Sequence, residues 1–142
     1  MSLGERETHF TNRAKEHLLD RTIVLTRKLS EDEASAVYWT TRPLVLQLDN
    51  GSVLVPSMDD EGNDGGTFSG KFVENELVGK KITFVGYMTE EESRNTRYNH
   101  RPIIMLLDDG GWIYPCRDGE RNDGGAMFGT SANGEELTFP VI

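Results

Sequence analysis

The sequence has few of the features that mark secreted, membrane or disulfide-stapled proteins. Its single cysteine, Cys116, cannot form an internal disulfide, which excludes a disulfide scaffold and indicates a reducing compartment, the cytoplasm. No apolar run approaches the roughly 20 residues that a helix needs to cross a bilayer. Residues 1–20 have no apolar core of the signal-peptide kind. We therefore expect a cytoplasmic protein that does not enter a membrane.

Basic residues are also scarce. The chain has 15 lysines and arginines against 24 aspartates and glutamates, a net charge of −9. A surface of that sign repels phosphate backbones, so we expect no nucleic-acid partner. Of the 142 residues, 36% are hydrophobic and 27% are charged, which is typical of one globular domain and not of a disordered chain.

The strongest positive signal is an internal repeat with an offset of 59 residues. Arg42-Pro43 recurs as Arg101-Pro102, and no gap is needed from Leu18/Leu77 to Gly70/Gly129. The densest cluster of identities is Asp59/Asp118, Glu61/Glu120, Asn63/Asn122, Asp64/Asp123, Gly65/Gly124 and Gly66/Gly125. An ungapped match of this length, with its glycines in register, indicates a tandem duplication.

The repeat predicts the fold class. Residues 1–17 form an N-terminal tail or short helix, 18–76 are the first repeat, and 77–142 are the second repeat. We expect an α+β fold, mostly β, in which each repeat is a β-α-β-β unit. One unit buries too little apolar surface to be stable alone, so the two units are expected to pack with pseudo-twofold symmetry around a shared core, as one compact domain.

Each repeat carries the same local signals in the same order. A β-branched, apolar run at 22–26, and again at 82–85, predicts a strand. A capping box then predicts a short helix in each repeat. The two boxes are Ser30 with Glu33 and Thr89 with Glu92. At the end of the chain, 137–142 predicts a last strand after a turn region at 129–136.

A hairpin follows each helix. Its turn is Asn50-Gly51 in the first repeat and Asp109-Gly110 in the second, pairs that favour a two-residue type I′ turn because both residues adopt positive φ. Such a turn places Leu48 opposite Val53, and it buries Trp112 at the corresponding position of the second hairpin. Both faces of each hairpin are apolar, so we expect the other repeat to cover the second face.

The acidic loops at 59–66 and 118–125 are the most function-like stretches. Alternating side-chain oxygens in a curved loop could bind a hard cation, and a weak Ca²⁺ site is one interpretation. Its ligands would be Asp59, Glu61, Asn63 and Asp64. The loop does not match an EF-hand, and Arg117 and Arg121 offset most of the negative charge of the second loop, where cation binding is doubtful. We favour the alternative, a turn whose Asp and Asn side chains bind their own backbone.

Arg42 and Arg101 each follow an aromatic residue by three positions, Trp39 and Tyr98 respectively. An arginine fork stacked on a ring could hold a carboxylate or phosphate ligand. The alternative, which we favour, is an internal ion pair with a carboxylate of the acidic loops.

No catalytic residues are predicted. Cys116 aligns with Ser57, which indicates packing and not a thiolate nucleophile, and nothing in the sequence brings Cys116 to His100. No phosphate-binding glycine loop and no zinc signature is present, so we expect no cofactor beyond weak Ca²⁺. The preferred hypothesis is a non-catalytic module that binds a protein or small molecule. A metal-assisted hydrolase using the acidic loop, and a structural or regulatory homodimer, remain the alternatives.

Overall fold

The computed structural model describes all 142 residues and is α+β, mostly β, with two antiparallel sheets. The helices are α1 (Leu3–Leu18), α2 (Glu31–Ala36), α3 (Glu90–Thr96) and the short 3₁₀ helix η1 (Glu74–Glu76). The strands are β1 (Ile23–Lys28), β2 (Leu44–Leu48), β3 (Val53–Ser57), β4 (Thr67–Lys71), β5 (Ile82–Tyr87), β6 (Ile103–Leu107), β7 (Trp112–Cys116), β8 (Ala126–Thr130) and β9 (Glu136–Phe139). No helix combines the length and the apolarity that a membrane crossing requires.

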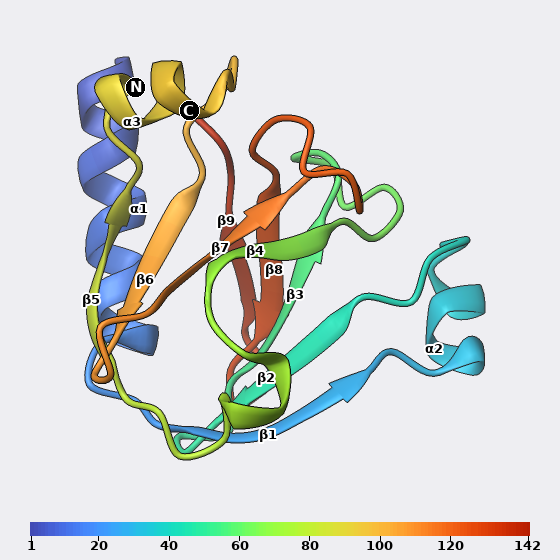
Figure 1. The fold of residues 1–142 in the computed structure, drawn as a ribbon. Helices are drawn as coiled ribbons and strands as arrows, with labels where there is room; N and C mark the ends of the chain where they lie inside the picture. The colour runs from blue at the N-terminus through green and yellow to red at the C-terminus, as the bar shows by residue number, and fades with distance from the viewer.

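Strands from both halves of the chain build each sheet. The first sheet has the order β1-β2-β3-β8-β9, and the second has the order β4-β7-β6-β5. Strand β4, from residues 18–76, therefore pairs with β7, whereas β8, from residues 77–142, pairs with β3. Figure 1 shows the two sheets with α1 along β5 on one side and α2 on the opposite side.

The main core lies between the sheets and includes residues of both halves. Its 19 buried side chains include Leu46 and Leu54 from the first half and Met105 and Ile113 from the second. Helix α1 contributes Ala14 and Leu18, both fully buried, so residues 1–17 are a docked helix and not a tail. Both predicted capping boxes are confirmed, and each starts a short helix at the expected residue.

Pairing of the first two strands is the same in the two halves. Ile23 lies opposite Leu48, and Ile82 lies opposite Leu107, 59 residues further along in both strands. A register shift follows Ile23 in one pair and Ile82 in the other. Strands β1–β2 and β5–β6 therefore have matching registers.

The predicted hairpin register is wrong by one residue. Leu46 lies opposite Leu54, and Gln47 lies opposite Val53. The loop is 49–51, closed by Leu48 N–H to the Ser52 carbonyl at 2.8 Å, and Gly51 is its only residue with positive φ, at 85°. The side chain of Asn50 explains the longer loop, because its Oδ1 accepts the Ser52 N–H at 3.0 Å and holds the turn open by one residue.

The expectation that the other half covers the second face of each hairpin is also wrong. Leu46 and Leu54 face the main core, but Val45, Val53 and Val55 point outward against Leu29, Ala34 and Trp39 of the α2 region. In the second half, Trp112 is not buried: 39% of it is exposed, and Lys71 lies over its ring at 5.8 Å. Short helices partly cover the outward faces, and from the other half Lys71 contacts Trp112.

Strands β4 and β8 were not predicted. The turn region expected at 129–136 begins later, because β8 continues to Thr130 before the turn to β9. Both strands contain a glycine, Gly70 and Gly129, and each pairs with a strand far away in the sequence, β4 with β7 and β8 with β3. Neither feature produces a local strand signal.

The paired glycines after each acidic loop are required where the chain passes between the sheets. A Cβ on Gly66 would lie 2.1 Å from the Cys116 carbonyl oxygen, and one on Gly125 would lie 2.5 Å from the Ser57 carbonyl oxygen. Real Cβ atoms do not approach a backbone oxygen this closely. A side chain at either glycine would therefore separate strands that belong to different halves.

We expect Gly66→Ala to lower the free energy of unfolding by about 1–3 kcal/mol, because the added methyl group overpacks a backbone contact. Gly119→Ala is the matched control, since a Cβ at this position would meet nothing within 4 Å, and it should change stability by less than about 0.5 kcal/mol. Urea unfolding of both variants measures the difference. Equal midpoints for the two variants would contradict this account of the contact.

Candidate functional site

The first acidic loop, residues 59–66, is closed by its own side chains. Asp59 Oδ1 accepts the backbone N–H groups of Glu61 at 2.9 Å and Asn63 at 3.0 Å, and Asp59 Oδ2 accepts Asn63 Nδ2–H at 3.0 Å. The second loop, residues 118–125, repeats this arrangement around Asp118. No group of three His, Cys, Asp or Glu side chains is arranged to hold a metal ion.

Asp64, the fourth predicted metal ligand, anchors the loop to the segment before β2. Its Oδ1 accepts the N–H groups of Thr40, Thr41 and Gly65, and its Oδ2 accepts the Thr40 hydroxyl at 2.7 Å. Burial opposes ionisation of this carboxyl group, but the hydrogen bonds outweigh burial and lower its pKa to about 2. Asp123 accepts the corresponding N–H groups in the second half.

The structure does not join either predicted arginine to its aromatic neighbour. Arg42 Nε donates to the Leu29 carbonyl at 2.7 Å, and Arg101 donates to the Met88 carbonyl at 3.3 Å. Their carboxylate partners are Glu31, at 3.9 Å from Arg42, and Glu7, at 2.6 Å from Arg101. These glutamates lie outside the acidic loops, where the ion pairs were expected.

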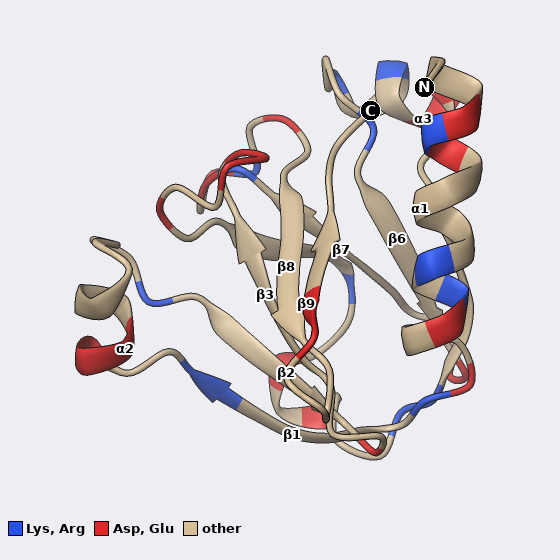
Figure 2. Ribbon diagram, turned by 180° about the vertical axis from the view of Figure 1, so that it is seen from behind, with Lys and Arg blue, Asp and Glu red and all other residues tan.

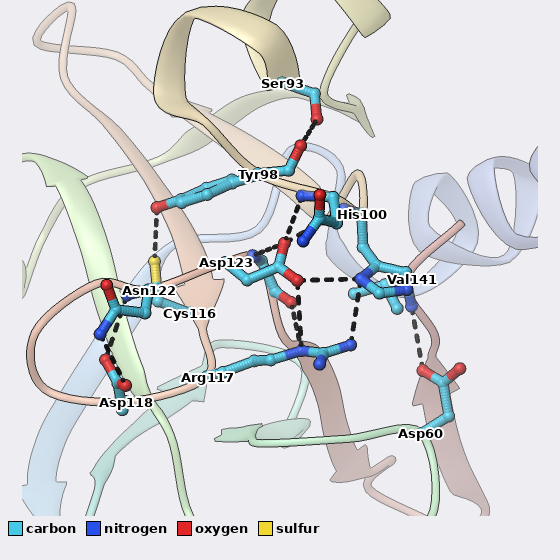
Figure 3. Close-up of polar contacts among 12 residues, drawn as sticks. Asp60, Ser93, Tyr98, His100, Cys116, Arg117, Asp118, Asn122, Asp123 and Val141 are labelled. Atoms are coloured by element: carbon cyan, nitrogen blue, oxygen red, sulfur yellow. Dashed lines mark hydrogen bonds and ion pairs between the residues drawn. The ribbon is translucent and has the colours of Figure 1, made fainter.

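The two aromatic residues have other partners. Trp39 Nε1–H donates to the Gly62 carbonyl at 2.8 Å, which ties the first loop to the end of α2. The Tyr98 hydroxyl and Cys116 Sγ share a hydrogen bond of 2.9 Å. Burial raises the pKa of the Cys116 thiol, whose residue is 0% exposed. Figure 3 shows the Cys116 sulfur directed at Tyr98 and not at His100. Cys116 and His100 therefore do not form a nucleophile–base pair.

Two matching apolar grooves lie on the outward faces of the sheets. The first groove, about 390 Å³, lies between α2 and strands β3 and β8. The second groove, about 360 Å³, lies between α3 and strands β6 and β7. Their walls include residues that occupy corresponding positions 59 apart: Leu29/Met88, Glu33/Glu92, Val37/Thr96, Val53/Trp112 and Val55/Tyr114.

Each groove has an acidic rim. Three consecutive acidic residues form the first turn of α2, at 31–33, and of α3, at 90–92. Figure 2 shows acidic residues at the start of α2 and in the loops beyond β3. Glu33 is bound by Arg27 at 2.7 Å, and this pair, with the Ser30 cap, lowers the Glu33 pKa to about 2. The Glu33 carboxylate beside the first groove is thus charged at neutral pH.

A separate polar cleft of about 490 Å³ lies where α1, the first loop and the end of β7 meet. Its polar residues are Arg6, Asp59, Asp60, Glu61, His100 and Arg117, and Val141 and Ile142 are its apolar residues. His100 Nδ1 lies 3.0 Å from Asp123 Oδ2 and 3.1 Å from Arg117 Nη2, as Figure 3 shows. The sequence alone does not reveal this cleft, because its residues come together only in the fold.

Comparison with known proteins finds no match: no family model, no curated protein and no solved structure is similar to this chain.

The Asp64 anchor predicts a specific loss of stability in acid. Its pKa of about 2 lies below the ordinary value of 3.8, so its contribution to stability is complete above 3.8 and disappears as the pH falls towards 2. At neutral pH, Asp64→Asn should be less stable by about 1–3 kcal/mol, because a partly buried set of donors loses its anion. Towards pH 2 the difference from the natural protein should shrink.

Chemical unfolding monitored by tryptophan fluorescence at several pH values tests this. Asp32→Asn is the control, because it removes the same charge from an exposed position of α2. A stability difference for Asp64→Asn that stays constant between neutral pH and pH 2 would show that the anchor is not electrostatic.

Proposed function

We propose that the protein is a non-catalytic binding module of the cytoplasm, and that its two apolar grooves bind short segments of partner proteins. One observation carries this proposal: an apolar groove occurs at corresponding positions on the outward face of both sheets. A helix of only 6 or 7 residues covers each face. Such a helix is too short to exclude solvent from the apolar strand positions beneath it.

Exposure of large apolar side chains supports a binding role. Phe84 is 47% exposed and Trp112 is 39% exposed, and both lie level with Leu106 across neighbouring strands of the second sheet. Near the first groove, Val37 is 51% exposed. Contiguous exposed apolar surface beside a groove is typical of a site that a partner covers.

The charges indicate the chemistry of the partner. Glu33 and Glu92 belong to the groove walls, and the first loop reaches the first groove through Gly62. With a net charge of −9, the chain attracts segments that carry lysine or arginine. The ligand that we propose is therefore an extended segment with apolar side chains for the groove and basic side chains for its rim.

We also infer that the two halves are tandem copies related by a pseudo-twofold axis. The matching registers of β1–β2 and β5–β6 support this, as does the reciprocal pairing of β4 with β7 and β8 with β3. Duplicated grooves imply two binding sites on each chain. A partner with two suitable segments would gain affinity by engaging both sites.

A short peptide of alternating leucine and lysine is the probe for the grooves. We expect the natural chain to bind two peptides, and Val37→Lys or Thr96→Lys alone to leave one, because each lysine places a like charge in one groove. The double variant should lose binding by roughly tenfold or more per site. Titration calorimetry gives both affinity and stoichiometry.

Val78→Lys is the matched control, since Val78 is 52% exposed and lies outside both grooves. A peptide of alternating leucine and glutamate should bind more weakly than the lysine peptide. Unchanged binding in the double variant would refute the proposal. A concentration-dependent dimer of the natural chain that the double variant abolishes would instead assign the grooves to a second copy of this chain.

A further inference from the structure

The polar cleft is lined on two sides by residues of opposite charge that form no direct ion pair with each other. Asp59, Asp60 and Glu61 all belong to the first loop, whereas Arg6 comes from α1 and Arg117 from the end of β7. No ion pair joins the two walls: Arg6 has no carboxylate within 4.0 Å, and Arg117 approaches only Asp123, at 3.8 Å. The cleft therefore offers positive and negative charge at once, on separate sides.

The polar groups of the cleft are held in place but keep free capacity. Asp60 Oδ1 accepts the Val141 N–H at 3.1 Å, which fixes the first loop and leaves Oδ2 without a protein partner. Arg117 Nε–H donates to the Gly124 carbonyl at 3.1 Å, so the guanidinium is positioned while part of it faces the cleft. A binding site for a small polar ligand requires charged groups that the protein holds in place in this way.

The corresponding positions of the other half carry uncharged residues on a matching backbone. Fifty-nine residues away, His100 corresponds to Thr41, Arg117 to Met58, and Asp60 to Gly119. Asp64 anchors Thr41 as Asp123 anchors His100, so the backbone arrangement is the same without the charged side chains. Arg117 and Asp60 are therefore charges of the cleft that have no counterpart 59 residues away.

The arrangement selects among ligand charges. A simple anion that approaches Arg6 and Arg117 also meets three carboxylates, and a simple cation near the first loop also meets the two arginines. A ligand with a separate anion and cation satisfies both walls at once. The geometry points to a binding site for a small zwitterion, an α-amino acid or a short peptide. Its carboxylate would lie at Arg6 and Arg117, and its ammonium group at Asp60 and Glu61.

The apolar residues of the cleft add a preference for the side chain of the ligand. Val141 and Ile142 line it together with the charged residues, and Val141 is 6% exposed. An apolar side chain on the zwitterion would be shielded from water there. This inference does not rest on the two grooves, which lie elsewhere on the molecule and bind a different class of ligand.

L-leucine and L-leucyl-L-leucine are the probes, titrated into the full chain by calorimetry at low salt. Two analogues each remove one charge: N-acetyl-L-leucine lacks the ammonium group, and L-leucinamide lacks the carboxylate. We expect at least one zwitterion to bind, and each charge-cancelled analogue of leucine to bind roughly tenfold more weakly or worse. Tighter binding of the free amino acid than of the dipeptide, or the reverse, identifies the source of the zwitterion.

The test variants introduce the residue that occupies the corresponding position of the other half, and we expect them to keep the fold intact. Arg117→Met and Asp60→Gly should each weaken zwitterion binding roughly tenfold while leaving the melting temperature within the range of the control. Arg94→Met removes the same charge from the exposed face of α3 and is the control. The proposal is overturned if neither zwitterion binds, if N-acetyl-L-leucine or L-leucinamide binds as tightly as leucine, or if Arg117→Met and Asp60→Gly leave binding unchanged.

Discussion

Two carboxylates, Asp64 and Asp123, fix the parts of the chain on which the rest of the structure depends. Each accepts backbone N–H groups from the segment that leads into the preceding hairpin and from the glycine directly after the aspartate. Beyond that glycine the chain leaves one sheet and enters the other. Strands β4 and β8 can reach their partners only because these loops turn in a fixed direction.

This anchoring explains why the acidic loops resemble a cation site in the sequence. A carboxylate has about four acceptor positions, and N–H groups fill them as well as a metal ion does. In the first loop, Asp59 binds two backbone N–H groups and the Asn63 amide. A cation would have to displace these bonds and reopen the turn. The alternation of Asp, Glu and Asn therefore serves the fold of the loop.

Features set by local chemistry could be predicted from the sequence, and features set by distant contacts could not. The capping boxes at Ser30 and Thr89 involve residues three positions apart, and both are present. The predicted hairpin register was wrong because the Asn50 side chain, and not turn preference alone, sets the loop length. A slip of one residue exchanges the two faces of a strand. It therefore misplaced Val53 and Trp112, which belong to the groove walls.

The candidate sites followed the same division. Arg42 and Arg101 recur, but recurrence also marks a structural role, and each binds the carbonyl of the residue before a helix cap. The polar cleft could not be predicted, because only its residues from the first acidic loop belong to a motif, and Arg6, His100 and Arg117 join them only in the fold.

Positions at which the two halves have the same residue and positions at which they differ have different physical roles. Positions that match serve the frame and the grooves, which occur in both halves. Positions that differ at the cleft, such as Arg117 against Met58, add charge where the same backbone is stable without it. With a net charge of −9, the long-range field of the chain opposes any anion, so a ligand carboxylate at Arg117 would be held by local contacts alone. Those contacts would be strongest for a ligand that brings its own cation to the opposite wall, because only then would the charges of both walls be compensated.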